Sequence, residues 1–155
     1  MSNEREIIEF LMQHIHCILD NDLEGYHDTT HPELTLYEWY VTPHRIDGIP
    51  FHDFMMESNA ARGTVFGAPS EGEQNDKTAD TRFDLANLKI QQYRETAIAS
   101  YTLLMSTALS TGVQVVAHNE SRVMVREEGK WRVVHCHKSP AWNAPHTPPP
   151  AGKPS

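Results

Sequence analysis

Several features that would reveal a function directly are scarce in this sequence. Cysteine is limited to Cys17 and Cys136, which argues against a disulfide framework and favours buried free thiols in a reducing compartment. No apolar run approaches the roughly 20 residues of a membrane span, and the polar start of the chain differs from a signal peptide. Lys and Arg number 13 against 21 Asp and Glu, and the net charge of −8 argues against binding to nucleic acid or an anionic membrane. We therefore expect a cytoplasmic protein that binds neither.

The sequence also lacks the common catalytic and metal-binding motifs. It has no Gly-rich phosphate loop, no nucleophile elbow and no Cys/His pair of recognisable spacing. His135 and His137 are two residues apart, and two rings on one strand face can serve a metal, but further ligands at suitable spacing are missing. Packing is therefore the favoured interpretation of this pair, and we predict no metal site and no cofactor.

The chain length predicts a single domain followed by a tail. With 155 residues, of which 39% are hydrophobic, the chain is long enough to bury about two thirds of its unfolded surface. We assign residues 1–142 to the domain and expect a flexible loop at 62–81, because this stretch is polar and has no periodicity. Prolines are frequent in residues 143–155, which predicts an extended or disordered tail.

Helical patterns occupy the first part of the domain. Apolar residues recur at helical spacing within residues 4–20, which predicts an amphipathic helix that lies on a sheet. Asp22 is suited to cap a short second helix that ends near Thr30. Pro50 suits the first position of a third helix that stops near Gly63. The side chains expected on the buried face of this third helix are Phe51, Phe54, Met55 and Ser58.

Strand patterns fill the remainder. Aromatic and β-branched residues predict strands at 35–41, 83–93 and 96–107, with a loop from Pro32 before the first of them and a final hairpin over 114–142. The aromatic side chains expected in the core rather than in a binding cage are Tyr37, Trp39, Tyr101 and Trp131. Because helices come first and a run of antiparallel strands follows, the fold class is α+β, with the sheet wrapped over the helices.

The turn of the final hairpin decides which side chains share a face. A two-residue turn would need positive φ at Glu128, which glutamate tolerates poorly, so we predict a three-residue loop from Glu127 to Gly129. The pairs that follow are Arg126–Lys130, Arg122–Val134, Glu120–Cys136 and His118–Lys138. One face mixes charge with apolar residues, as a pocket wall would, and contains His118, Glu120, Arg122, Met124, Val134, Cys136 and Lys138. The other face contains Val123, Val125, Trp131, Val133, His135 and His137.

Three stretches carry a more specific pattern: Phe51-His52 at a helix start, Glu120-Ser121-Arg122-Val123, and Gly129-Lys130-Trp131-Arg132-Val133-Val134-His135-Cys136-His137-Lys138-Ser139. They resemble the association (hub) domain of calcium/calmodulin-dependent protein kinase II, and the similarity covers most of residues 5–142. The resemblance implies the nuclear transport factor 2-like, or SnoaL-like, superfamily with its cystatin-like fold. In that fold a cone-shaped, curved antiparallel sheet wraps around an N-terminal helix, with two further short helices and a pocket at the open end. Since the chain has no kinase domain, we expect a stand-alone relative.

The resemblance also implies positions for a ligand pocket. The family's pocket residues correspond to His52, Arg122 and Lys138, while a further pocket arginine is replaced by Leu103, so one cation is lost. The predicted hairpin register independently puts Arg122 and Lys138 on one face. Together these arguments predict an anion-accepting pocket, for which the full set of ligand-binding candidates is His52, Tyr101, Glu120, Arg122 and Lys138.

Each of the charged candidates has two interpretations. Arg122 either clamps a ligand carboxylate or forms an internal ion pair with Glu120 or another acid. His52, in a first helical turn, is either a neutral hydrogen-bond donor or weak base, or simply an exposed residue. Glu120 is either a general base or the charge balance for Arg122. The catalytic candidates are therefore His52 and Glu120.

Two hypotheses about function follow. The first is a non-catalytic domain that self-associates and binds a small carboxylate in its cone, with a homodimer preferred over a larger ring. Its partner surface would be an apolar sheet face formed by Val123, Val125, Trp131 and Val133. The second is a SnoaL-like isomerase, cyclase or dehydratase that transfers protons in the same pocket, with Arg122 stabilising negative charge.

Overall fold

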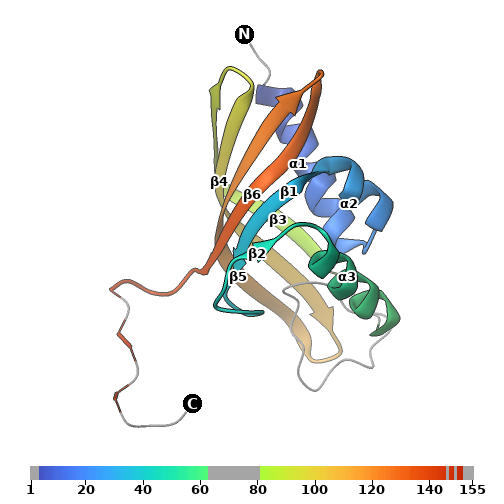
Figure 1. The fold of residues 1–155 in the computed structure, drawn as a ribbon. Helices are drawn as coiled ribbons and strands as arrows, with labels where there is room; N and C mark the ends of the chain where they lie inside the picture. Colours follow the sequence, from blue (N-terminus) through green and yellow to red (C-terminus); the bar gives the residue numbers. More distant parts are fainter. Residues whose placement is uncertain (1–3, 63–80, 146, 149, 152–155) are drawn as a thin grey trace.

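The computed structural model describes residues 4–62, 81–145, 147–148 and 150–151 (Figure 1). Its elements in chain order are α1 (Glu4–Leu19), α2 (Leu23–Thr29), β1 (Thr30–Glu38), β2 (Ile46–Asp47), α3 (Pro50–Arg62), β3 (Thr81–Tyr93), β4 (Thr96–Leu109), β5 (Gly112–Glu127) and β6 (Lys130–Pro140). The loop predicted at 62–81 lies outside the described residues except at its ends, where α3 stops and β3 begins. None of the described helices is long and apolar enough to cross a membrane.

The described strands form one curved, unclosed sheet in the order β2-β1-β6-β5-β4-β3 (Figure 1). Neighbouring strands are antiparallel except for β1 and β6, which run parallel. The sheet is therefore mixed rather than wholly antiparallel, while the predicted α+β class, with three helices against a curved sheet, is confirmed. All three helices lie on one side of the sheet, and the N-terminal end of α1 lies beside the tips of the β3–β4 and β5–β6 hairpins (Figure 1).

The first two helices form where the sequence predicts them. α1 buries an apolar stripe formed by Ile7, Leu11, Ile15 and Ile18. The Asp22 carboxylate caps α2 by accepting a hydrogen bond from the Gly25 N–H at 3.1 Å. A Cβ on Gly25 would lie 2.5 Å from Cys17 Sγ, so the glycine allows α2 to pack closely against the end of α1. This packing buries Tyr26 and Thr29 of α2.

β1 is longer than predicted, and two aromatic residues at its end and in the turn that follows are exposed. It begins at Thr30, directly after α2, so the predicted loop from Pro32 is wrong. Its inner side buries Leu34, Leu36 and Glu38. Tyr37 and Trp39 are 37% and 41% exposed, so their predicted place in the core is wrong. The aromatic residues confirmed in the core are Tyr101 and Trp131.

α3 starts at Pro50 as predicted but turns a different face inward. Among residues 50–58 of this helix the buried side chains are His52 and Met56, one turn apart, whereas Phe51 and Phe54 are 38% and 63% exposed. Hydrophobicity selected the wrong face because the polar His52 finds hydrogen-bond partners inside the protein. The predicted face is therefore wrong for Phe51 and Phe54, whereas Met55 is partly buried and packs against the core.

The β5–β6 hairpin combines two departures from the predicted register. Glu128 and Gly129 both have positive φ, at 52° and 75°, and form a two-residue turn, so the predicted three-residue loop is wrong. Near this turn the two faces of β6 are the reverse of the prediction, so Trp131 and Val133 point into the core. Val134 is then an extra residue on β6, because Met124 pairs with Val133 but Val123 pairs with His135. Beyond this bulge the predicted inner face is restored.

Two consequences follow from the observed register. The predicted pairs Arg122–Val134 and Glu120–Cys136 are replaced by Arg122–Cys136 and Glu120–Lys138, a shift of two positions that keeps all these cationic and acidic groups on the inner side. The predicted apolar partner surface is wrong in part, because Trp131 and Val133 belong to the core.

Candidate functional site

The five predicted ligand-binding residues converge on the inner side of the sheet. All of them are buried: His52, Tyr101, Glu120, Arg122 and Lys138. His52 comes from the first turn of α3, Tyr101 from β4, and Lys138 from β6, where it pairs with Glu120 of β5. They belong to two hydrogen-bonded groups, which we name the Arg122 cluster and the Lys138 cluster.

The Arg122 cluster is built around a buried ion pair. Arg122 Nη2 donates to Glu120 Oε1 at 3.1 Å, and Arg122 Nε donates to the Tyr101 hydroxyl at 2.8 Å. The same hydroxyl donates to Glu120 Oε1 at 2.7 Å. Glu120 Oε2 lies 2.6 Å from His118 Nε2. Arg122 and Glu120 therefore form the internal ion pair that was one of the two interpretations of Arg122.

His14 of α1 extends this cluster toward the helices. Its Nε2 lies 2.9 Å from Arg122 Nη1, and because a guanidinium only donates, this ring nitrogen accepts. The ring proton is then on Nδ1 and faces Thr29 Oγ1 at 2.8 Å, while Thr29 donates to the Gly25 carbonyl at 2.9 Å. Burial, followed by the charge of Arg122, lowers the pKa of His14 well below its ordinary value, in agreement with a neutral ring.

The Lys138 cluster is a second ion pair with its own chain of hydrogen bonds. Lys138 Nζ donates to Glu38 Oε1 at 2.8 Å and lies 3.4 Å from the Tyr40 hydroxyl. His52 Nε2 lies 3.1 Å from the same carboxylate oxygen, and His52 Nδ1 is hydrogen-bonded to the Tyr26 hydroxyl. A buried chain of hydrogen bonds therefore runs from Tyr26 through His52 to Glu38 and Lys138.

The two clusters keep their acids ionised. Burial alone would raise the pKa of Glu38, but Lys138 and the neighbouring histidine outweigh it and lower this pKa to about 2. Arg122 likewise outweighs burial and holds the pKa of Glu120 below its ordinary range. Burial raises the pKa of the Tyr101 hydroxyl, which therefore keeps its proton. Among the residues that the structure describes, the charges of the buried Arg122 and Lys138 are balanced by those of Glu38 and Glu120.

Little free space remains around these charges. A cavity of about 10 Å³ is lined by both cations and by Glu38, whose Oε2 has no hydrogen-bond partner among the described residues. A second cavity, of about 20 Å³, lies between Arg122, Lys138 and apolar side chains of α1 and β4. Each volume suits about one water molecule. An organic ligand would therefore need side chains at the mouth of the cone to move.

Sequence reasoning missed several members of the clusters. They are His14, Tyr26, Glu38 and Tyr40, while His118 was assigned only to the correct face. His14 falls within the apolar stripe of α1, and that position was a usable signal. Glu38 could have been found if β1 had been started at Thr30, because it continues the alternation of buried residues along the strand.

The His135–His137 pair lies outside these clusters. His135 Nδ1 is 2.8 Å from Thr35 Oγ1, and the His137 ring packs on Tyr37 with 5.1 Å between centroids. Among the residues that the structure describes, no three His, Cys, Asp or Glu side chains group as metal ligands would. Both rings are accounted for by packing and hydrogen bonding.

Comparison with known proteins identifies the family. The model of the calcium/calmodulin dependent protein kinase II association domain matches residues 3–67 and 70–142. This chain belongs to that family. It is 28% identical over 159 residues to the calcium/calmodulin-dependent protein kinase type II delta subunit of Oryctolagus cuniculus, a match that covers 98% of this chain and 27% of the relative. The chain thus spans about a quarter of the length of the curated relatives it matches.

Solved structures agree on the fold. The CaMKII hub homology domain of Chlamydomonas reinhardtii has a TM-score of 0.73 at 21% identity, and the match covers 91% of this chain and 100% of that chain. A nuclear transport factor 2-like protein from Cytophaga hutchinsonii has a TM-score of 0.60 at 13% identity, covering 90% of this chain and 99% of that one. The predicted family and its nuclear transport factor 2-like fold are therefore confirmed.

Proposed function

We propose that this protein is a self-associating association domain whose basic unit is a homodimer, with a larger ring as a further assembly. The single observation that supports this most is the match of nearly the whole domain to the association-domain model, joined by hub structures among its neighbours. The two buried free thiols, Cys17 and Cys136, support a reducing, cytoplasmic location.

The surface that a second copy would cover is the outer face of β4 and β5. Val113 and Val115 are 71% and 58% exposed and two residues apart, so they share this face. Val113 pairs with Ala108, and further along the strands Ala117 pairs with Leu104, which extends an apolar strip across both strands. Adjacent exposed apolar side chains of this kind are common where subunits meet.

Sedimentation equilibrium at micromolar concentration tests this proposal. The wild-type chain should sediment as a dimer or a larger closed assembly, and the double variant Val113→Glu, Val115→Glu should shift toward monomer. Phe54→Glu is the matched control, because it adds a charge at a site that is 63% exposed on α3, away from this face. A wild-type chain that is monomeric throughout the concentration range would contradict the proposal.

We further propose that the cone binds a small carboxylate between His52, Arg122 and Lys138, beside Tyr101 and Glu120. The support is that the two small cavities both border Arg122 and Lys138. Since the interior charges already cancel, an added anion must bring a proton with it, which a buried histidine or glutamate would accept. Binding should therefore strengthen as the pH falls.

An NMR titration with acetate at pH 7.5 and pH 5.5 tests the anion site. Acetate should shift the resonances of the inner strands, with at least tenfold tighter binding at the lower pH if one proton is taken up. The double variant Glu38→Gln, Lys138→Gln removes one ion pair without leaving a net charge and should abolish the response. Lys130→Gln, which lies on the surface, should leave it unchanged. An unaltered response in the double variant would contradict this site.

A SnoaL-like isomerase, cyclase or dehydratase is the second candidate. It is favoured by the pairs His52–Glu38 and His118–Glu120, which are buried histidine–carboxylate pairs of the type used for proton transfer. Binding of a small carboxylate requires these cavities to open less than turnover of a larger substrate does. Proton–deuterium exchange at the α-carbon of a small ketone, followed by NMR, separates the two: catalysed exchange lost in His52→Asn supports an enzyme.

A further inference from the structure

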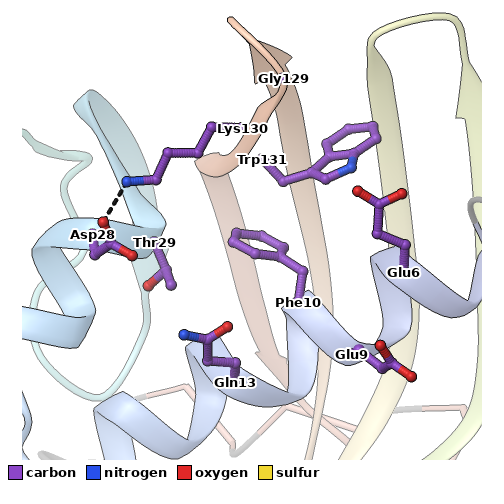
Figure 2. A pocket seen from close by; sticks show the side chains of 9 residues that line it. All are labelled: Glu6, Glu9, Phe10, Gln13, Asp28, Thr29, Gly129, Lys130 and Trp131. Atoms are coloured by element: carbon purple, nitrogen blue, oxygen red, sulfur yellow. Dashed lines mark hydrogen bonds and ion pairs between the residues drawn. The ribbon is translucent and has the colours of Figure 1, made fainter.

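A surface groove of about 360 Å³ lies apart from the interior clusters (Figure 2). One wall is the N-terminal half of α1, the second is the end of α2, and the third is the tip of the β5–β6 hairpin. The side chains that line it, apart from the turn glycine, are Glu6, Glu9, Phe10, Gln13, Asp28, Thr29, Lys130 and Trp131. Phe10 and Trp131 supply the apolar part. Thr29 and Phe10 also contact His14 of the Arg122 cluster, Thr29 through a hydrogen bond and Phe10 through ring stacking.

The rim of the groove has an excess of negative charge. Lys130 reaches across one end to form an ion pair with Asp28 (Figure 2), and Arg5 pairs with Glu9 at 2.9 Å on the exposed side of α1. The Glu6 carboxylate forms no hydrogen bond or close ion pair with any described residue. It interacts only at longer range with Arg126, which pairs with Glu95 and lies 5.2 Å from the centre of the Trp131 ring. A cationic group that enters between Glu6 and Glu9 would therefore complete the charge balance of the rim.

Trp131 supplies a second, independent indication of a ligand. Its side chain is 4% exposed, and its indole Nε1 is buried without a hydrogen-bond partner among the described residues. Figure 2 shows this nitrogen on the edge of the ring that faces Glu6. A buried N–H without an acceptor is costly, so an acceptor brought into the groove as Glu6 turns aside would be favoured.

We propose that this groove binds a short basic peptide segment of a partner protein. A Lys or Arg side chain of the segment lies over Phe10 and Trp131 and ends between Glu6 and Glu9. A backbone carbonyl of the segment accepts from Trp131 Nε1. Long cationic side chains pack their stems on aromatic rings and gain from charge–ring attraction. The net charge of −8 disfavours a second copy of this chain in the groove, and a simple diamine has no carbonyl for the indole.

An NMR titration with two acetylated pentapeptide amides tests the proposal. One has the sequence Ala-Lys-Ala-Arg-Ala, and in the other Gln replaces both basic residues. The observed signal is the Trp131 indole N–H, one of three tryptophan signals, assigned by its loss in Trp131→Phe. The basic peptide should shift this signal downfield, and the Gln peptide should not. Binding should weaken about fivefold or more in the double variant Glu6→Gln, Glu9→Gln.

The control variant is Glu4→Gln, an exposed acid of the same helix that does not line the groove. It should bind the basic peptide as the wild type does. Equal binding of the Gln peptide, an unmoved Trp131 signal, or the same loss in Glu4→Gln would each overturn the proposal. Cadaverine is the last probe: if it moves the Trp131 signal as far as the peptide does, the carbonyl contact is refuted.

Discussion

Replacing Arg122 by methionine tests whether the cone interior is held by its own ion pairs. Arg122 makes hydrogen bonds to Glu120, Tyr101 and His14, and all four side chains are buried. Methionine keeps most of the apolar stem but removes every donor. The Glu120 carboxylate is then left in the interior without its cation, and the Tyr101 hydroxyl loses a donor.

The expected loss follows from that burial. Breaking a buried ion pair by removing one partner costs about 3–5 kcal/mol, because the remaining charge is uncompensated. The double variant Arg122→Met, Glu120→Gln removes both charges and should be more stable than Arg122→Met alone. Arg126→Met is the control on the same strand: its ion pair with Glu95 lies at the surface, where the Glu95 side chain is 61% exposed, so its loss should cost much less than the loss of Arg122.

Urea unfolding followed by circular dichroism measures these differences at one fixed protein concentration, so that self-association affects all variants equally. The predicted order, from the most to the least stable protein, is wild type, Arg126→Met, the double variant and Arg122→Met. If Arg122→Met unfolds within about 1 kcal/mol of wild type, Arg122 is not paired in solution, and the charge balance inferred for the cone is refuted.

Four further predictions concern the pH dependence of stability, helix packing and the hairpin turn. The pKa of Glu38 in the folded protein is about 2, whereas its ordinary value is 4.5. About 3 kcal/mol of stability, present above pH 5, should therefore be lost as the pH falls from 4.5 to 2. Urea unfolding that shows no loss in this range would contradict this prediction. His14 is neutral when folded, so stability should begin to fall below pH 6.5, its ordinary pKa, and His14→Gln should remove that part. Gly25→Ala should cost about 1–3 kcal/mol in thermal unfolding, because its Cβ would collide with Asp22 Oδ2 and Cys17 Sγ. An unchanged midpoint would show that these two side chains can move aside. Glu128→Asn should stabilise the turn by up to about 1 kcal/mol, whereas a loss would argue against positive φ there.

The sequence allowed the inner face of the cone to be predicted for a partly fortuitous reason. The turn was predicted one residue too long, and the bulge at Val134 was not foreseen. Together they displace the pairing by two positions, an even number, so Arg122 and Lys138 remained on the predicted face. Trp131 and Val133, between the turn and the bulge, were assigned to the wrong face. A bulge has no dependable signal in one sequence, since it is fixed by packing on both sides of the sheet.

The ion pairs were harder to predict than the cations. Glu38 lies about one hundred residues before Lys138 in the chain and meets it only because β1 pairs in parallel with β6. A pairing of this kind depends on topology, which local propensity does not report. His52 was selected from the resemblance, and its inward position contradicts the hydrophobic pattern of α3, where Phe54 is exposed. Polar residues whose hydrogen bonds are all made inside a protein cannot be predicted from hydrophobicity alone.

The central claim is that the cations of the cone are already neutralised by Glu38 and Glu120. A carbon-13 NMR titration of the glutamate carboxyl groups in the folded protein tests it most directly. The resonances of these two residues should not titrate between pH 7 and pH 4, because both pKa values lie below the ordinary glutamate value of 4.5. A titration midpoint at or above 4.5 for either residue would contradict it.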